Sequence, residues 1–219
     1  MKTLLVALLG VGALARADLV IVQKVEGGGQ SGEQTIRIKG DRARTDLAPQ
    51  ISVISDAATG ESVTLMHAPK TFLRITAARN QALVEKMQQR RPAGDPPKLT
   101  TSGRKEKLGS YECEIFTTSF GGVSVTYWIA ATFPNYPAIL AQLGKLQAGS
   151  ISAMGRGLMP ELKDFPGFPI KTEMERGTEK VSSVVLSVKE EPVDPASFET
   201  PKNYTEVSAP APPVPPQQP

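Results

Sequence analysis

The sequence predicts an α+β fold, in which one antiparallel β-sheet is accompanied by two helices. Short runs rich in β-branched residues recur along most of the chain and are separated by turn residues, which is the pattern of an antiparallel meander. Two further segments carry apolar residues at helical spacing. The single cysteine, Cys113, cannot form an intramolecular disulfide, so burial of apolar side chains must stabilise the fold.

Six strands are predicted between Asp18 and Thr76, separated by residues that favour turns. Residues 27–32, Gly-Gly-Gly-Gln-Ser-Gly, look like a phosphate-binding loop only superficially, because they lack its Gly-Lys-Ser/Thr ending and precede a strand. We interpret them as a flexible hairpin. The predicted strands are residues 19–25, 34–39, 42–47, 51–55, 62–66 and 71–76. Joined by hairpins, they form a continuous sheet.

After Thr76, a candidate N-cap, the spacing of apolar residues changes from that of a strand to that of a helix. Leu83, Val84 and Met87 recur at helical spacing within residues 77–91, and a proline ends this predicted helix. Residues 91–102 are rich in proline and glycine and are predicted to form a crossover loop.

Strands resume in a predicted hairpin formed by residues 111–119 and 123–130. A second helix starts near Tyr136, and its one-sided apolar stripe, which includes Ile139 and Leu140, must lie on the sheet. The remaining predictions are a loop at residues 147–169, strands at 170–175 and 181–189, and a short helical turn at 194–198.

The first seventeen residues are typical of a signal peptide. Lys2 supplies a positive start, residues 4–14 form an apolar core, and Ala15-Arg16-Ala17 have the small-x-small pattern that precedes cleavage. The apolar run is shorter than the roughly 20 residues of a transmembrane helix. We therefore predict a cleaved signal peptide over residues 1–17 and a periplasmic or secreted protein. Because the apolar run is this short, we expect no transmembrane anchor, and because no lipobox cysteine follows the cut, we expect no lipid anchor.

Residues 18–207 are predicted to form a single domain, and the Pro-rich residues 208–219 a disordered tail. The chain has 25 Lys and Arg against 22 Asp and Glu, and two of the basic residues, Lys2 and Arg16, lie in the signal peptide. The mature chain is therefore close to neutral, and no predicted element combines basic and aromatic residues as nucleic-acid binding requires. We expect no nucleic-acid partner.

Residues with catalytic or metal-binding chemistry are sparse. His67 is the only histidine, and we interpret it as a polar residue at a strand end rather than a catalytic base. Cys113 alternates with charged neighbours and is predicted to be a buried structural thiol. One histidine and one cysteine cannot close a zinc site, and neither a calcium loop nor a nucleophile elbow occurs. The spacing of Asp and Glu residues alone does not exclude a carboxylate pair that acts as acid and base, as in glycosidases. We nevertheless expect that the protein is not an enzyme and that it binds no cofactor and no metal.

The most distinctive polar run is Gly-Asp-Arg-Ala-Arg-Thr-Asp at residues 40–46. On a strand, Arg42, Arg44 and Asp46 share one face. One interpretation is a solvated face with a cross-strand ion pair, which contributes little free energy. The other places Arg44 and Asp46 at the polar rim of a cavity, with Arg44 as a donor to a ligand headgroup.

An apolar, glycine-containing segment lies within residues 147–169. Flexible side chains of this kind suit adaptable binding of apolar ligands, so the segment is a candidate lid. The alternative is that this segment packs on the sheet as a fixed part of the core. The candidate lid residues are Met154, Leu158, Met159, Leu162, Phe165 and Phe168.

The segments IKGDRARTDL, GSYECEIFTTSFGGVSVTYWIA and FPGFPIKTEME resemble the bacterial domain of unknown function 4412 (DUF4412) family, which is related to the LolA/LolB-like lipoprotein-carrier superfamily. The resemblance implies a strongly curved antiparallel sheet, a LolA-like half-open barrel, with two helices and a loop covering its concave face. It also implies acyl chains as ligands. No carrier motif is specific enough to assign residue roles.

Two hypotheses for function follow. The first is an exported, non-enzymatic binding module that shields a lipid, an acyl chain or another apolar ligand between the sheet and the helices. The alternative is a structural or protein-interaction module of the cell envelope that takes no small ligand and binds an envelope partner through strand edges or the Pro-rich tail.

Overall fold

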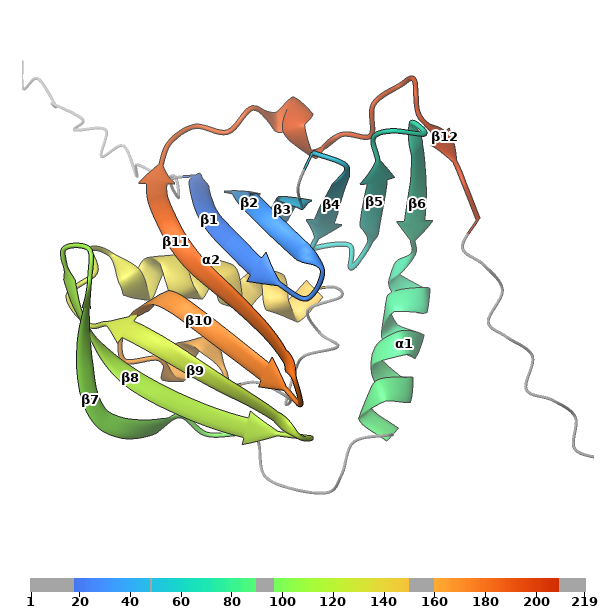
Figure 1. The fold of residues 1–219 in the computed structure, drawn as a ribbon. Helices are drawn as coiled ribbons and strands as arrows, with labels where there is room; N and C mark the ends of the chain where they lie inside the picture. Colours follow the sequence, from blue (N-terminus) through green and yellow to red (C-terminus); the bar gives the residue numbers. More distant parts are fainter. Residues whose placement is uncertain (1–17, 48, 90–96, 150–159, 209–219) are drawn as a thin grey trace, which may run out of the picture.

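The computed structural model describes residues 18–47, 49–89, 97–149 and 160–208. Its strands form one 12-stranded sheet in the order β12-β6-β5-β4-β3-β2-β1-β11-β10-β9-β8-β7 (Figure 1). All neighbours pair antiparallel except β12, which runs parallel to β6. Within the described residues the sheet is open, with edges at β7 and β12. The large antiparallel sheet with two helices is confirmed, whereas the half-barrel shape stays a prediction.

The N-terminal half of the sheet is a meander of the six predicted strands, and each follows its predecessor in space as in sequence. They are β1 (Leu19–Gly27), β2 (Gln30–Lys39), β3 (Arg42–Leu47), β4 (Ile51–Asp56), β5 (Ser62–Met66) and β6 (Thr71–Ile75). The glycine-rich run is the β1–β2 hairpin as predicted, and Gly28 and Gly29 adopt φ values of 61° and 77°, which favour glycine. Helix α1 (Ala77–Gln89) follows β6.

The C-terminal half contains the remaining strands and helix α2 (Tyr136–Gly149). The strands are β7 (Thr100–Leu108), β8 (Tyr111–Phe120), β9 (Val123–Ala130), β10 (Phe168–Arg176), β11 (Glu179–Glu190) and β12 (Thr205–Glu206). Two short 3₁₀ turns, η2 (Leu162–Asp164) and η3 (Pro195–Phe198), complete the described elements. Strand β11 pairs with β1 and so joins the two halves.

The prediction of a loop through residue 102 was wrong at its end, because β7 begins at Thr100. The reason is its sequence, TTSGRKEKL, which lacks the alternation of apolar and polar residues that identifies a half-buried strand. Residues 100–107 are all exposed at the edge of the sheet, so no core contact selects apolar side chains there. Strand β12 was also missed, because two exposed residues carry no periodic signal.

The two faces of β1–β6 contact different parts of the chain. On the inner face, Ile38 and Ala43 belong to a buried cluster that includes Ile139 and Leu140 of α2. On the outer face, Ile54 and other apolar residues form a second cluster with Val193 and Phe198. We call residues 191–207, which supply these two side chains and β12, the C-terminal strap.

Several predictions concern single residues or the chain ends. Cys113 is free and fully buried, as predicted. No helix within the described ranges is long and apolar enough to cross a membrane. The predicted signal peptide and residues 209–219 of the predicted tail lie outside the described residues, so both stay predictions.

Candidate functional site

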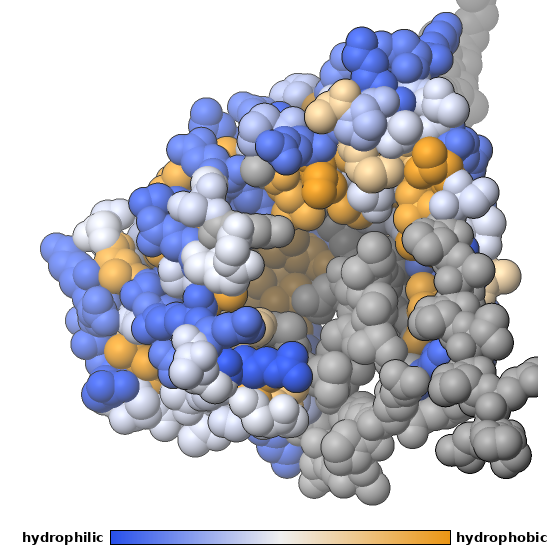
Figure 2. All heavy atoms as spheres, turned by 45° about the vertical axis from the view of Figure 1, so that its right-hand side comes forward, coloured by the Kyte–Doolittle hydropathy of each residue, from blue (hydrophilic) through white to orange (hydrophobic). Residues whose placement is uncertain are grey.

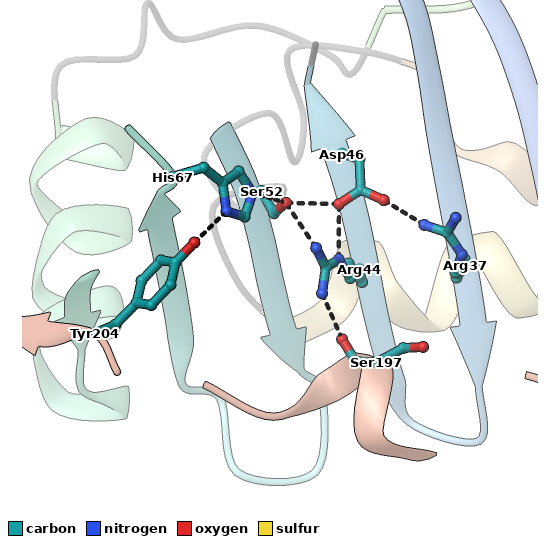
Figure 3. Close-up of polar contacts among 7 residues, drawn as sticks. All are labelled: Arg37, Arg44, Asp46, Ser52, His67, Ser197 and Tyr204. Carbon is teal, nitrogen blue, oxygen red and sulfur yellow. Dashed lines mark hydrogen bonds and ion pairs between the residues drawn. The ribbon is translucent and has the colours of Figure 1, made fainter. Parts of the chain in front are cut away.

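A polar network connects four strands or strand ends to the C-terminal strap on the outer face of the sheet (Figure 3). Arg44 and Asp46 come from β3, where residues two apart point to the same face. Ser52 lies directly opposite Asp46 on β4, and Arg37 lies opposite Arg44 on β2. The residues in the network are Arg37, Arg44, Asp46, Ser52, His67 and Tyr204.

Asp46 is the acceptor at the centre of this network. Its Oδ1 accepts from Arg44 Nε at 2.7 Å and from Ser52 Oγ at 2.6 Å, and its Oδ2 pairs with Arg37. Burial raises the pKa of this carboxyl, but the hydrogen bonds from Ser52, Arg44 and Arg37 and the positive charge of Arg44 outweigh burial, so the pKa is lowered overall. Asp46 is therefore ionised at neutral pH.

The ionised Asp46 fixes the direction of the hydrogen bonds at Ser52. The Ser52 hydroxyl has one proton, which it donates in the hydrogen bond to Asp46. The Ser52 oxygen therefore accepts from Arg44 Nη2 at 3.0 Å and from His67 Nε2 at 2.7 Å. His67 Nδ1 then accepts from the Tyr204 hydroxyl at 2.6 Å. Donation runs from Tyr204 through His67 and Ser52 to Asp46. His67 is thus the polar strand-end residue that the sequence predicted, immediately after β5.

Arg44 also holds the strap, since its Nη1 donates to the Ser197 carbonyl oxygen at 3.0 Å. Its side chain is 20% exposed and uses all three nitrogens within the protein. The cross-strand ion pairs that one interpretation predicted are present, between Arg37 and Asp46 and between Arg42 and Asp56. Arg44 therefore acts as an internal donor, on the face opposite α2 and Phe165.

We expect Tyr204→Phe to weaken the strap. The variant keeps the edge-on ring contact with His67 but loses the hydroxyl that donates to Nδ1, which should lower the free energy of unfolding by about 1 kcal/mol. Urea unfolding measures this loss, and limited proteolysis should show faster cleavage near the strap. Ser197→Ala is the control, because Arg44 binds the backbone carbonyl there. Equal stability of the two variants would contradict the prediction.

Three of the candidate lid residues lie in the described part of the chain, and all three pack into the core. Phe165 contacts the Tyr127 ring edge-on at 5.1 Å between centroids, and Phe168 stacks on Phe133 at 4.5 Å. Leu162 packs against the same buried cluster. Met154, Leu158 and Met159 lie outside the described residues. The described part of the segment thus fills the core, and its role as a lid stays a prediction.

The inner face of β3–β6 carries an apolar patch that sequence reasoning missed. Alternation from Ala43 places the patch residues on the α2 side, and none of them belongs to either buried cluster of the described residues. Ile51 is 38% exposed and the others are half-buried. The patch residues are Leu47, Ile51, Val53, Met66 and Leu73.

Figure 2 shows a hollow on the side of the molecule toward β6 and α1, where hydrophobic residues gather at its floor and rim. Helix α2 approaches β4 and also β10, so it lies beside both halves of the sheet. The described ranges contain no group of three or more His, Cys, Asp or Glu residues that could hold a metal ion. The apolar patch and the polar network are the two candidate sites, and they lie on opposite faces.

Comparison with known proteins gives a family match. The model described as "Domain of unknown function (DUF4412)" matches residues 20–204. No curated protein matches the chain. Among solved structures, PNGF-II matches in two crystal forms, P21 and C2, with 13% identity and TM-scores of 0.44 and 0.43. These matches cover 88% of this chain but only 32% and 31% of PNGF-II, so the chain spans about a third of that protein's length.

A DUF1329 family protein from Desulfovibrio piger also matches, with 8% identity and a TM-score of 0.28. This match covers 85% of this chain and 91% of the other. At these TM-scores, none of these three matches establishes a shared fold.

Proposed function

This chain belongs to the DUF4412 family, a domain of unknown function, and we propose that it is a non-enzymatic binding module that shields a lipid or another apolar ligand. The observation that carries the proposal is the apolar patch on the inner face of the sheet. Ligand sites for apolar molecules are concave and lined mainly by hydrophobic side chains. The patch offers such a lining next to α2, and the hollow in Figure 2 lies on the same side of the molecule as β6.

The polar network supports a role without catalysis. A serine nucleophile must give its proton to a histidine that acts as base. Here the Ser52 hydroxyl donates its hydrogen bond to the ionised Asp46, and His67 donates to Ser52 instead of accepting from it. Ser52 is also only 1% exposed and lies under the strap. The network therefore supports a structural role, in which it holds the strap on the outer face.

The proposed site predicts that Ile51→Glu weakens lipid binding. A carboxylate in the patch would have to be desolvated by a bound acyl chain, so we expect at least a tenfold loss of affinity for a fluorescent fatty acid. Fluorescence titration measures the affinity, and native mass spectrometry with lipid extraction checks for co-purified lipid.

Leu186→Glu is the matched control, since Leu186 is 51% exposed on β11, outside the patch. Both substitutions replace an exposed apolar residue, so both should change stability by less than about 0.5 kcal/mol. An equal loss of affinity in the two variants would contradict the assignment of the patch. A wild-type protein that purifies empty and ignores fatty acids would overturn the proposed function.

The protein is further proposed to act outside the cytoplasm, in the periplasm or after secretion, on the strength of the signal-peptide pattern in residues 1–17. N-terminal sequencing of the protein recovered from cell fractions tests this. A mature chain that starts at Asp18 supports export, and a chain that retains Met1 in the cytoplasm contradicts it.

The sheet edges give little support to the alternative function, a structural or protein-interaction module of the cell envelope. The free edge strand β7 carries Arg104, Lys105 and Lys107 and an irregular register between Thr101 and Lys105. Charged residues and bulges of this kind disfavour the addition of a further strand. The edge at β6 is already covered by β12.

A further inference from the structure

Two buried hydroxyl groups lie in the core without a hydrogen-bond partner. They are Tyr127 OH and Thr118 Oγ1, and their residues are 3% and 5% exposed. No protein group among the described residues satisfies either one. Buried polar groups are nearly always hydrogen-bonded, because burial without a partner costs free energy. Two such groups on neighbouring strands therefore require an explanation.

The register of β8 and β9 places both hydroxyls on one face. Thr118 lies opposite Val125, and Tyr127 lies two residues further along β9 on the same side. Such diagonal neighbours have their backbones about 7–8 Å apart, within reach of an aromatic side chain. This face packs against Phe165, a candidate lid residue, whose ring meets the Tyr127 ring edge-on.

Both groups are available as donors. Burial raises the pKa of Tyr127 to about 12, so its hydroxyl stays protonated at any physiological pH. The Thr118 hydroxyl does not ionise. Because their surroundings are apolar, a neutral acceptor such as a carbonyl oxygen suits them better than a charged group, whose desolvation would be costly.

We propose that Tyr127 and Thr118 donate to the carbonyl oxygen of an esterified acyl chain, and so select ligands with an ester group over plain hydrocarbons. The inference rests on the proposed function and deepens it. Tyr127 belongs to the same buried cluster as α2, and α2 approaches both β4, which carries part of the apolar patch, and β10, which pairs with β9. The hydroxyls would bind the polar end of the ligand, and apolar side chains would contact its chain.

The test uses one fluorophore in three forms: diphenylhexatriene, its propionic acid and the methyl ester of that acid. The wild-type protein should bind the ester more tightly than the hydrocarbon. Tyr127→Phe and Thr118→Val should each lower the affinity for the ester about tenfold and leave the affinity for the hydrocarbon unchanged. The acid distinguishes a free fatty acid from an esterified chain as the preferred ligand.

Tyr111→Phe is the control, because Tyr111 begins β8 and its ring packs against Phe133, tilted by 36°. This variant should bind all three probes as the wild type does. The inference is overturned if the variants bind the ester unchanged, as they would if the hydroxyls only held a water molecule. An equal loss for ester and hydrocarbon overturns it as well, because the hydroxyls would then serve packing alone. If the wild type binds none of the probes, both the inference and the proposed function fail.

Discussion

Gly167→Ala should lower the free energy of unfolding by about 3 kcal/mol, because an added methyl group overfills a buried contact. A Cβ at Gly167 would lie 2.5 Å from the Ala130 carbonyl oxygen and 2.7 Å from Ala131 Cα. Both are backbone atoms and cannot rotate away. The contact lies where β9 and β10 meet, since Ala130 pairs with the next residue, Phe168.

Relief of this clash would move residues of the core. Phe165 and Phe168 flank Gly167, and both are buried against other aromatic rings. For a chain of this size, the expected loss corresponds to a decrease of about 6–12 °C in Tm. Thermal unfolding followed by circular dichroism measures it.

Gly144→Ala is the matched control for this substitution. Gly144 lies in α2, and a Cβ there would meet no atom within 4 Å. Alanine is the better helix former, so this variant should be as stable as the wild type or more stable by up to about 1 kcal/mol. The prediction for Gly167 fails if both variants unfold at the same temperature.

The sequence predicted the strands whose side chains alternate. In β9, for example, Val125, Tyr127 and Ile129 are all buried on one face, while their polar neighbours Ser124 and Thr126 are not. Strand β7 escaped prediction because it lies at an edge with no buried face. Alternation therefore identifies a strand only where one of its faces is buried.

The polar network could be predicted only in part. A hairpin between residues 42–47 and 51–55 with a short turn would have placed Asp46 opposite Ser52, and this register is observed. The contact between His67 and Tyr204 joins residues 137 positions apart, and no local pattern indicates it. Arg44 was singled out for its charge, but its partners depend on the path of the strap.

The two orphan hydroxyls show a further limit of sequence reasoning. Register alone would place Thr118 and Tyr127 on one face of the β8–β9 hairpin. Whether a hydroxyl finds a partner depends on the side chains that pack over it, here those around Phe165. That packing is set by the tertiary structure, so an unsatisfied group is visible only once the whole core is assembled.

Asp46→Asn should destabilise the protein by about 2 kcal/mol at neutral pH, because it removes the charge on which two arginines and a serine converge. The asparagine oxygen can still accept from Arg44 and Ser52. Its NH₂ group would then face Arg37, which also has only donors to offer. Arg37 and the amide would be left without acceptors in a partly buried position.

The pH dependence of this loss separates the charge of Asp46 from its shape. Because the folded protein lowers the pKa of Asp46, ionisation of Asp46 stabilises the fold above the ordinary carboxyl pKa of about 3.9, and this stabilisation is lost as the pH falls through the lower, folded-state pKa. The difference between wild type and Asp46→Asn should therefore be largest at pH 7 and shrink below about pH 4. Urea unfolding at pH 7 and pH 3 measures both values.

Asp41→Asn is the control for this pH series, because Asp41 is exposed in the neighbouring β2–β3 turn and, among the described residues, no hydrogen bond or ion pair holds its side chain. Its stability should follow that of the wild type at both pH values. The Asp46 variant should also bind fatty acid as the wild type does, because the network lies on the face opposite the apolar patch. A stability difference that stays constant from pH 7 to pH 3 would mean that the carboxylate charge contributes nothing. A loss of fatty-acid binding in a folded Asp46→Asn protein would show instead that the two faces of the sheet are coupled.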